Sequence, residues 1–407
     1  MIMLISFSVT NFKLFKDTAT LDMTATADRK LIDNVMDAGM KRGILRTASV
    51  YGANASGKTT LFQAMVMFRN FVMLSPSHMD NSRLNYTPFA LDPDCANRPT
   101  GFETVAVIKG VRYAYSFSYN IERITEESLF YYPNGRKTKV FERAGQDFSF
   151  GSDKRFREGN ARRVKEKVLF LSVSAQFNDE VCAELYNWIS SGLMIMCGYD
   201  QALSLDILTD SMSKDERFRK LVLKAFKIAD FGITDVFDSN KKKSLKLPQD
   251  GSELPFLAVQ DLRVKHSVNG KTVVFPISSE SSGTVRFMSV IGPVVSALIN
   301  GWTLVIDEID MSFHTDVCQW IVNLFLDPAE NRHGAQLIFN THEVGLLDQS
   351  IVRRDQIWFT VRDWSTGASD LRRLSDYKVR NNTDIRKAYL NGSFGAKPFI
   401  APERLME

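Results

Sequence analysis

The sequence predicts an α/β fold in which a mixed sheet carries an antiparallel lobe, together with a compact helical insertion. Residues 52–59 read GANASGKT and lie between two mostly apolar runs, as a loop between a strand and a helix does. Strand-like runs separated by turn residues fill most of 102–143, and apolar residues between about 180 and 232 recur largely at helical spacing. These three observations carry the prediction.

The bulk composition bounds the class of protein. The chain has 407 residues, of which 44% are hydrophobic, so it can bury a large core in two or three lobes. Its formal net charge of +4 neither demands nor excludes nucleic acid, because a local basic stripe can hide within it. The four cysteines are widely spaced and form no C-x-x-C motif, which fits a reducing compartment and indicates neither a zinc site nor a disulfide framework.

The N-terminal residues argue against a secretory signal. Met1–Ser8 alternates like a strand and lacks a basic region followed by a long apolar core. No segment comes close to the roughly 20 apolar residues that a membrane span needs. We therefore expect a cytoplasmic protein with no membrane partner.

Changes of pattern along the chain predict three parts. Residues 1–180 form a first lobe with an N-terminal hairpin that turns near Lys16 and Asp17, the GANASGKT loop and an antiparallel sheet. Residues 181–256 form the helical insertion and a loop. Residues 257–407 form a second lobe, which holds the remaining motifs.

The GANASGKT loop matches the pattern G-x-x-x-x-G-K-[ST], which binds nucleotide phosphates. Its glycines allow backbone angles that aim successive N–H groups at phosphate oxygens. Lys58 would bridge the β- and γ-phosphates, and the Thr59 hydroxyl would bind Mg²⁺. The predicted nucleotide-binding residues are Gly52, Asn54, Ala55, Ser56, Gly57, Lys58, Thr59 and Thr60.

The second motif is an apolar run that ends in two acids, Trp302-Thr303-Leu304-Val305-Ile306-Asp307-Glu308. In P-loop proteins the first acid holds Mg²⁺, and the adjacent Glu can polarise the attacking water. The alternative is a strand that ends in a solvated acid pair. The presence of GANASGKT upstream favours the functional interpretation, with Asp307 as metal ligand and Glu308 as catalytic residue.

Two further stretches each allow a functional and a structural interpretation. Glu280-Ser281-Ser282-Gly283-Thr284 precedes an apolar helix, where small residues let N–H groups approach an anion, or where a serine only caps the helix. The run 336–342 is a buried strand that ends in Asn340, Thr341 and His342. His342 could touch a γ-phosphate, or could be a surface histidine at the end of a strand.

Together the four motifs resemble the ABC-type ATPase head shared by the RecF and SMC families. The chain is most similar to the stand-alone bacterial ATPases of the RloA/AbiLi type, related to those of Septu, of the AriA component of PARIS and of some retron systems. The resemblance covers nearly the whole chain. It implies an ABC-type P-loop ATPase head that uses ATP and Mg²⁺.

The resemblance also implies roles for individual residues. The run 52–59 is then the Walker A loop, Asp307 and Glu308 are the Walker B acids, and His342 is the switch histidine, which joins Lys58 and Glu308 in catalysis. Further residues similar to family motifs are Lys13 near the nucleotide in Asn11-Phe12-Lys13, Gln176 as a Q-loop metal ligand, Ser281 and Gly283 of the signature, the D-loop region Asp310–His314, and a closing motif at 389–396.

For function, the resemblance implies a homodimer in which ATP on one copy is covered by Ser281 and Gly283 of the other. Higher oligomers are compatible with it. Hydrolysis would be slow and act as a switch. The family further implies antiphage defence, with a separate effector encoded nearby, because the chain carries no nuclease motif after the ATPase head.

A DNA-repair clamp of the RecF type, which would bind DNA, is the main alternative. A transporter subunit is disfavoured, because Glu280 and Ser282 replace the Leu and Gly usual in transporter signatures. The long coiled coil of SMC and Rad50-like proteins is also missing, which argues against long-range tethering of DNA.

Overall fold

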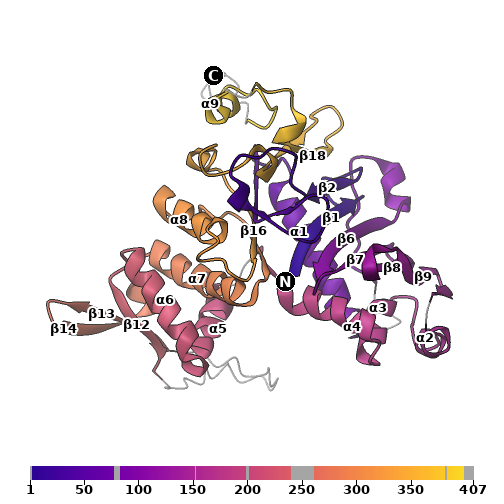
Figure 1. The fold of residues 1–407 in the computed structure, drawn as a ribbon, viewed down its shortest axis with the longest axis horizontal. Helices are drawn as coiled ribbons and strands as arrows, with labels where there is room; N and C mark the ends of the chain where they lie inside the picture. Colours follow the sequence, from indigo (N-terminus) through magenta and orange to yellow (C-terminus); the bar gives the residue numbers. More distant parts are fainter. Residues whose placement is uncertain are drawn as a thin grey trace, which may run out of the picture. The chain divides into compact units, whose positions relative to one another are not determined.

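The computed structural model describes residues 2–77, 83–151, 153–198, 201–239, 261–380 and 383–397. By internal contacts the chain divides into two units. The first consists of Met1–Gly198, Ala297–Asp310 and Cys318–Glu407, and the second of Tyr199–Ser296 and Met311–Val317. Figure 1 draws the chain with its elements labelled. The three-part division expected from the sequence stays a prediction.

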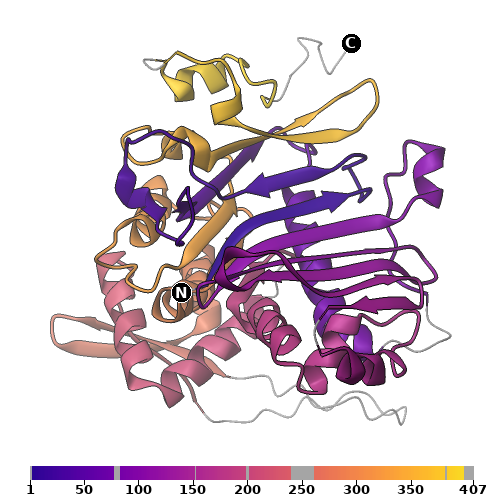
Figure 2. The same ribbon diagram turned by 45° about the vertical axis from the view of Figure 1, so that its right-hand side comes forward.

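A seven-stranded antiparallel sheet forms one layer of the first unit, with the order β10-β9-β8-β7-β6-β1-β2 (Figure 2). Its strands are β1 (Ile2–Thr10), β2 (Ala19–Asp22), β6 (Thr100–Ile108), β7 (Val111–Tyr119), β8 (Ile124–Tyr132), β9 (Thr138–Ala144) and β10 (Asp147–Phe150). The predicted N-terminal hairpin is the antiparallel pair of β1 and β2. The strand-like runs between 102 and 143 fall on β6 to β9, so the predicted antiparallel lobe is confirmed.

A six-stranded sheet forms the second layer, with the order β11-β15-β16-β5-β17-β18. Its strands are β5 (Thr47–Gly52), β11 (Leu193–Met196), β15 (Thr303–Ile306), β16 (Gln336–Asn340), β17 (Ile357–Arg362) and β18 (Ser369–Arg373). All neighbouring strands are parallel except β17 and β18. The sheet is therefore mixed, and five of its strands end at one edge.

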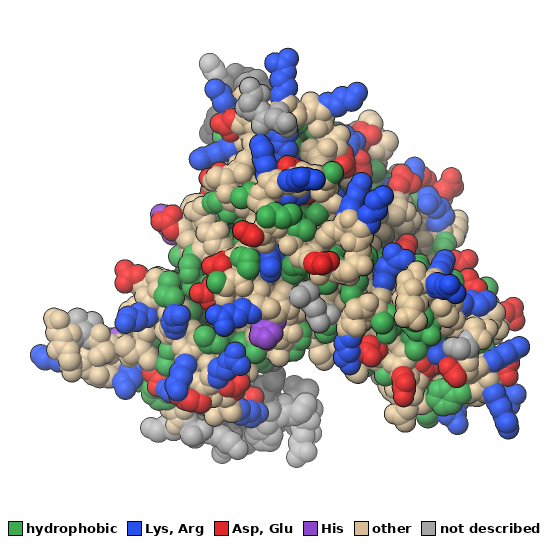
Figure 3. Space-filling model, viewed as in Figure 1, with side chains coloured by type: hydrophobic (Ala, Val, Ile, Leu, Met, Phe, Trp, Pro, Cys, Tyr) green, Lys and Arg blue, Asp and Glu red, His purple; other side chains and the backbone are tan. Residues whose placement is uncertain are grey.

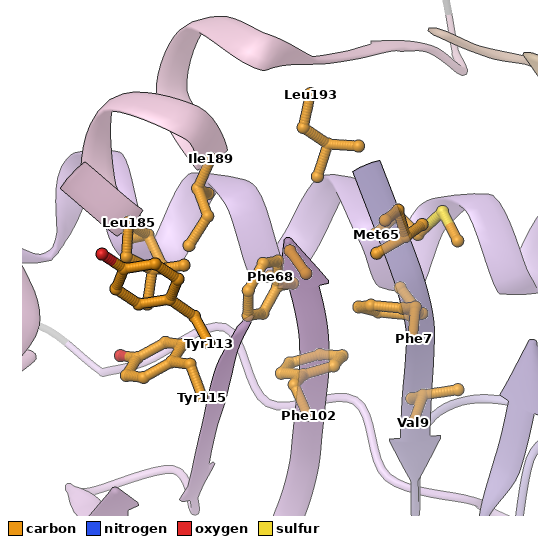
Figure 4. Close-up of a cluster of buried hydrophobic side chains, with 14 of the residues drawn as sticks. Phe7, Val9, Met65, Phe68, Phe102, Tyr113, Tyr115, Leu185, Ile189 and Leu193 are labelled. Carbon is orange, nitrogen blue, oxygen red and sulfur yellow. The ribbon is translucent and has the colours of Figure 1, made fainter. Parts of the chain in front are cut away.

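Helix α1 (Lys58–Leu74) contacts both sheets and forms the centre of the core. Phe68 of α1 packs edge-on against Phe7 of β1, with ring centroids 5.7 Å apart, and stacks on Phe117 of β7 at 5.8 Å. Figure 4 shows Phe68 of α1 between the rings of Tyr113 and Phe7, above Phe102, with Met65 next to Phe7. Burial of these large rings, each worth a few kcal/mol relative to exposure (about 1.5–3 for Phe), anchors the helix that follows the Walker A loop.

One strand within the predicted insertion, which begins at residue 181, was not expected from the sequence. Strand β11 lies inside that range, yet it pairs in parallel with β15 at the edge of the six-stranded sheet. Its sequence, Leu-Met-Ile-Met, is a short continuous apolar run, and periodicity alone cannot assign such a run to strand or helix. In the sequence this run therefore cannot be distinguished from the helical pattern of the residues around it.

Shorter elements complete the first unit. The helices are α2 (Lys154–Ala161), α3 (Phe170–Gln176), α4 (Glu180–Asn187), the π-helical turn Trp188–Gly192, α8 (Thr315–Leu326, whose first residues belong to the second unit) and α9 (Ile385–Leu390). Strands β3 (Val35–Met36) and β4 (Ile44–Leu45) pair with each other. Buried Glu127 accepts hydrogen bonds from the backbone N–H groups of Phe170 and Leu171 and so caps the start of α3.

The closing motif at 389–396, whose role the sequence leaves open, covers the face of β17. Phe359 of β17 stacks on Phe394 at 4.7 Å and on Tyr389 at 5.7 Å, in both cases with ring planes 12° apart. Tyr389 also meets Tyr51 of β5, edge-on at 5.8 Å. The motif thus packs an aromatic cluster onto the two strands that flank the Walker A loop.

The second unit contains two helices of the predicted insertion, α5 (Gln201–Lys214) and α6 (Glu216–Ile228), whereas α4 belongs to the first unit. It also holds the antiparallel strands β12 (Ile233–Asp238), β13 (Leu262–Val268) and β14 (Lys271–Pro276), and most of α7 (Ser282–Asn300). The predicted compact helical insertion is represented by α5 and α6. The end of that insertion, with its loop, falls on residues 240–260, outside the described residues.

Helix α7 comes closer to a membrane span than the sequence analysis expects. Within the described part of the chain it alone is long and apolar enough by length and composition, with a mean hydropathy of 1.5. However, 61% of that apolar window is buried inside the protein. Such burial is what a core helix shows, so α7 is weak evidence for a membrane segment.

Candidate functional site

The candidate site lies in the first unit, at the edge where the parallel strands end. Gly52 ends β5 opposite Thr360 of β17, Ile306 ends β15 opposite Phe339, and Asn340 ends β16 opposite Val50. Ligands of open α/β sheets bind in the crevice outside the carboxyl ends of such strands. The loop GANASGKT leaves this edge from β5, and Asp307 and Glu308 leave it from β15.

The Walker A loop has the backbone conformation that its glycines predict. Gly57 has a φ of 107° directly before α1, and Ala55 at the exposed tip beside Asn54 has a φ of 57°. A Cβ on Gly52 would lie 2.2 Å from Thr360 Oγ1 and 2.4 Å from Ser56 Oγ, so only glycine fits there. The hydroxyls of buried Ser56 and Thr360 are 2.6 Å apart and tie the loop to β17.

Lys58 is buried at the start of α1, and its ammonium group faces the loop. Its Nζ donates to the carbonyl oxygens of Gly52 at 2.8 Å and Ala53 at 3.1 Å. Burial lowers the pKa of Lys58 to about 8, against the attraction of the nearby acids Glu308, Asp310 and Asp307. The cation is thus held at the loop in a place where added negative charge would stabilise it.

Asp307, directly after β15, accepts hydrogen bonds from side chains of three other segments. One carboxylate oxygen accepts from Thr59 Oγ1 at 3.2 Å and from Asn340 Nδ2 at 2.5 Å, and the other from Cys197 Sγ at 3.5 Å. Mg²⁺ commonly uses one or two protein oxygens plus phosphates and water. The pair of Thr59 and Asp307 fits that pattern. No cluster of three or more His, Cys, Asp or Glu side chains occurs among the described residues to offer a different metal site.

Glu308 follows in a backbone conformation that side chains rarely adopt, with a φ of 52°. Its N–H donates to Asn340 Oδ1 at 2.5 Å, and its side chain is exposed. A left-handed non-glycine residue costs roughly 1–2 kcal/mol, so this conformation requires support from its surroundings. The buried amide of Asn340 provides it by contacting both acids at once.

His342 lies exposed just beyond β16. Its backbone N–H donates to Asp310 Oδ2 at 3.2 Å, which links the loop after β16 to the loop after β15. Burial and the charge of Lys58 lower the pKa of His342, although Asp310 and Glu308 oppose the shift. The imidazole is therefore neutral near pH 7 and belongs to the same electrostatic cluster as Lys58.

Lys13 reaches α1 from the turn between β1 and β2. Its Nζ donates to Gln63 Oε1 at 2.7 Å, and Gln63 lies one helical turn after Thr59. Burial and Asp307 raise the pKa of the Cys197 thiol to about 12, and the charge of Lys13 opposes this rise. Lys13 thus lies near the site, as the family resemblance implies.

Gln176 does not lie near this edge. It is exposed at the end of α3, where Ser172 Oγ donates to the carbonyl of Val72 at 2.6 Å. Val72 follows Lys58 by 14 residues, about 20 Å along α1 at roughly 1.5 Å per residue. One turn of α3 returns only about 6 Å of that distance. The geometry therefore does not support the expected role of Gln176 as a metal ligand.

The signature residues Ser281 and Gly283 belong to the second unit. Ser281 Oγ accepts from the backbone N–H of Thr284 at 3.1 Å, which is the bond of a helix N-cap. The structural interpretation of the serine therefore holds in the single chain. A Cβ on Gly283 would lie 2.9 Å from the carbonyl oxygen of Ser312, so glycine permits a close approach of the D-loop region. An exposed Ser281 stays free to face another molecule as well.

Sequence reasoning missed three residues that shape the site: Asn340, Cys197 and Thr360. Asn340 is one of three polar residues that end the run 336–342, and the sequence analysis predicts a role only for His342. Its position at the carboxyl end of a buried strand, level with the acid pair, is a signal that could have found it. Cys197 and Thr360 could not be found in this way, because the strands β11 and β17 had not been placed beside β15 and β5.

Among the solved structures that are similar to this chain are two heads of SMC proteins. One is the SMC head bound to the C-winged helix domain of ScpA, at 10% identity and a TM-score of 0.48, with 91% of this chain and 97% of that chain covered. The other is the SMC head domain from Thermotoga maritima, at 13% identity and a TM-score of 0.41, with 91% and 98% covered. No curated protein matches the chain.

A family model gives the assignment. The model described as "AAA domain, putative AbiEii toxin, Type IV TA system" matches residues 48–348, well over half of the 407 residues. The match begins in β5 and includes the Walker A loop, the acid pair and His342. The α/β fold predicted from the sequence, a mixed sheet with an antiparallel lobe and a P-loop, is confirmed. The chain belongs to the family of AAA domains that this description names.

Proposed function

We propose that this protein binds and hydrolyses ATP and that ATP joins two copies of the chain. The observation that carries the proposal is the convergence of Lys58, Thr59 and Asp307 at one sheet edge, with Glu308 beside them. These are the residue types that hold phosphates and a metal and that orient water. The membership in an AAA-domain family supports it.

In the proposed reaction the backbone N–H groups of the loop and the Lys58 ammonium bind the phosphates. Thr59 and Asp307 would hold Mg²⁺, which would supply positive charge to neutralise the phosphates. The Glu308 carboxylate orients a water molecule for attack and accepts its proton. Asn340 positions both acids, and neutral His342 offers a hydrogen-bond donor toward the γ-phosphate.

The second copy would complete the site. The exposed Ser281 and the start of α7, the positive end of the helix dipole, would cover the γ-phosphate held by the partner copy. ATP would then stabilise the dimer by linkage, because it binds the closed form better than the open one. Loss of the γ-phosphate on hydrolysis would weaken the contact. Slow turnover suits such a switch.

The biological role we propose is antiphage defence, with the ATPase as sensor or scaffold for a separate effector. The family description names a putative toxin and a type IV toxin–antitoxin system, which is a setting of paired proteins. Purification of the protein with its chromosomal neighbours would test this role. A stoichiometric small protein that leaves on ATP hydrolysis supports it, and a protein that never retains a neighbour's product contradicts it.

The proposed ATP-dependent assembly is tested by molar mass in solution. Glu308→Gln should bind ATP and Mg²⁺ without hydrolysing it, and so accumulate the dimer or a higher assembly in light scattering. The double variant with Ser281→Arg should bind ATP and keep the mass of the nucleotide-free state. If Glu308→Gln keeps one mass with and without ATP, nucleotide does not control assembly.

A DNA-repair clamp of the RecF type is a second candidate, favoured by a basic surface on α2. The hollow there has a volume of about 680 Å³ and includes the exposed ring of Phe156. In Figure 3, Lys and Arg side chains stand at the lower right, where Figure 1 places α2. Exposed cations in this stretch are Lys154, Arg155, Arg162, Arg163 and Lys165.

The clamp predicts ATP-dependent DNA binding that weakens steeply with salt. Charge reversal of Arg155 and Arg163 should abolish it, whereas reversal of the exposed Lys30, on a different segment, should not. Absence of any salt-dependent DNA binding with ATP present would remove this candidate.

A further inference from the structure

We propose that Trp364, together with Leu91, forms a platform on which the base of the bound nucleotide stacks. The inference rests on the proposed function, since it needs a nucleotide on the Walker A loop. It concerns the turn 363–368 between β17 and β18, to which no motif in the sequence assigns a role.

The turn is held rigidly by Asp363. The Asp363 N–H donates to the carbonyl of Ala368 at 2.8 Å, and the N–H of Gly367 donates to the carbonyl of Asp363 at 2.7 Å. The Asp363 carboxylate accepts from both the N–H and the hydroxyl of Ser365, at 2.8 and 2.7 Å. Trp364 is therefore presented on an ordered turn, yet 74% of it is exposed. A fixed and exposed aromatic ring is available for stacking at little conformational cost.

Arg362 connects this turn to the Walker A loop. Its Nη1 donates to the carbonyl oxygen of Ala55, at the tip of the loop, at 3.4 Å. Its Nε donates to the carbonyl of Gly367 at 3.2 Å, and its guanidinium carbon lies 5.0 Å from the centroid of the Trp364 ring. A single guanidinium group thus bridges the phosphate-binding loop and the exposed ring.

Leu91 adds a second exposed apolar side chain at the same turn, with 62% of it accessible. A Cβ on Gly367 would lie 2.1 Å from Leu91 Cδ1 and 3.7 Å from Arg362 Nη2, so both side chains meet at this glycine. The residue after Leu91, Asp92, pairs with Lys16 of the N-terminal hairpin at 2.8 Å. Leu91 and Trp364 therefore flank one small region beside the loop.

The order of the strands places this region at the base end of a nucleotide. Asp307 and Asn340 come from β15 and β16, on one side of β5, and they mark the metal and the γ-phosphate. Strand β17 and its turn lie on the other side of β5. A triphosphate whose γ end points toward Asp307 across the Walker A loop leads its nucleoside toward the turn 363–368. A base arriving there meets the face of Trp364 and the apolar surface of Leu91.

The platform predicts that Trp364 contributes to binding of nucleosides but not of bare phosphates. Stacking of a base on an aromatic ring is worth about 1–3 kcal/mol and tolerates any base, which corresponds to roughly 5- to 150-fold in Kd. We therefore expect Trp364→Ala to weaken ATP and GTP alike, by at least about five-fold. Binding of inorganic tripolyphosphate, which has no base, should be unchanged.

The experiment is titration calorimetry of the full chain with Mg²⁺ and either ATP, GTP or inorganic tripolyphosphate. Trp364→Phe should keep most of the affinity for ATP, since the ring remains. Ile32→Ala, which removes an apolar side chain elsewhere that is as exposed as Leu91, should change nothing. In the wild type, ATP should quench tryptophan fluorescence, and Trp364→Phe should lose that quenching.

Two results would overturn the platform: equal ATP affinity in Trp364→Ala and the wild type, or an equal loss for ATP and tripolyphosphate, which would mean that the turn only supports the loop. Failure of the proposed function looks different, because the wild type would then bind neither ATP nor tripolyphosphate.

Discussion

The strand ends of the first unit and the start of α7 in the second differ in how complete they are. At the strand ends, Asp307 has partners from α1, from β16 and from the residue after β11, and the backbone of Glu308 is fixed by Asn340. At α7, Ser281 caps its own helix and Gly283 allows a close backbone approach. The first region is assembled within one chain. The second is a capped helix terminus, which under the proposed function would cover phosphates held by a partner copy.

The largest effect is expected where the assembled region carries chemistry. Glu308→Gln should lower the hydrolysis rate by about 100-fold or more, as loss of a general base does. Its ATP affinity should stay within a few-fold of the wild type, because Glu308 is exposed and its backbone bond to Asn340 is retained. Single-turnover hydrolysis and equilibrium binding measure the two quantities. An unchanged rate would remove Glu308 from the mechanism.

Lys58→Met tests the phosphate-binding half alone. Loss of hydrogen bonds from a cation to phosphate costs about 1.5–3 kcal/mol, so ATP affinity should fall roughly 10- to 100-fold. Calorimetry checks this. The variant should be no less stable than the wild type without ATP, because burial already disfavours the charge of Lys58. If Lys58→Met keeps the full affinity for ATP, the strand ends of the first unit do not bind the phosphates.

Asn340→Ala sharpens the claim that the acids are preassembled. Hydrolysis should fall about ten-fold, while ATP affinity changes little, since Asn340 acts through Asp307 and Glu308 and not on phosphate. Loss of this buried amide should also lower the free energy of unfolding by about 1–3 kcal/mol. Asn340→Asp retains the acceptor for the Glu308 N–H but places a second buried carboxylate against Asp307, so it should recover none of the stability. Denaturant unfolding and steady-state rates provide the readouts.

The smallest effect is a pH dependence that arises from Lys58. Its pKa in the folded, nucleotide-free protein is about 8, below its ordinary 10.5, so the unfolded chain binds more protons between these values and stability rises with pH across that window. ATP binding must return the proton, so its affinity should fall above pH 8, by at most about ten-fold per pH unit.

The shifted pKa values of the neighbouring groups lie outside the pH range in which Lys58 titrates. The pKa of His342 is lowered from its ordinary value and lies below this window, and the pKa of Cys197 is about 12, above it. Calorimetry at pH 8.5 in two buffers of different ionisation enthalpy should show proton uptake in the wild type and none in Lys58→Met. Equal uptake in both would assign the proton elsewhere.

Local motifs predicted the site better than they predicted its surroundings. Gly52–Thr59 and the acid pair lie in short runs whose strand–loop–helix context is visible in the sequence, and the structure brings Thr59 and Asp307 together. The position of β11 could not be read, because four apolar residues have no diagnostic period and parallel pairing is non-local. Gln176 failed for the same reason: its motif resembles a family loop, but the topology places it near the far end of α1.

The structural role of the closing motif was also out of reach. Tyr389 and Phe394 are spaced like an ordinary helix end and turn, and only the fold shows that both stack on Phe359. Trp364 carried no signal at all, since a single exposed aromatic residue in a turn is unremarkable in a sequence.

The most direct test of the shared-site claim is complementation between two inactive variants. Lys58→Met breaks the phosphate-binding half and Ser281→Arg breaks the covering half, so each homodimer should be inactive. A mixed dimer has one site with both halves intact. Equal amounts that exchange freely should recover roughly a quarter of wild-type hydrolysis. If the mixture stays as inactive as its components although exchange is demonstrated, or if Ser281→Arg alone hydrolyses ATP at the wild-type rate, two copies do not share the site.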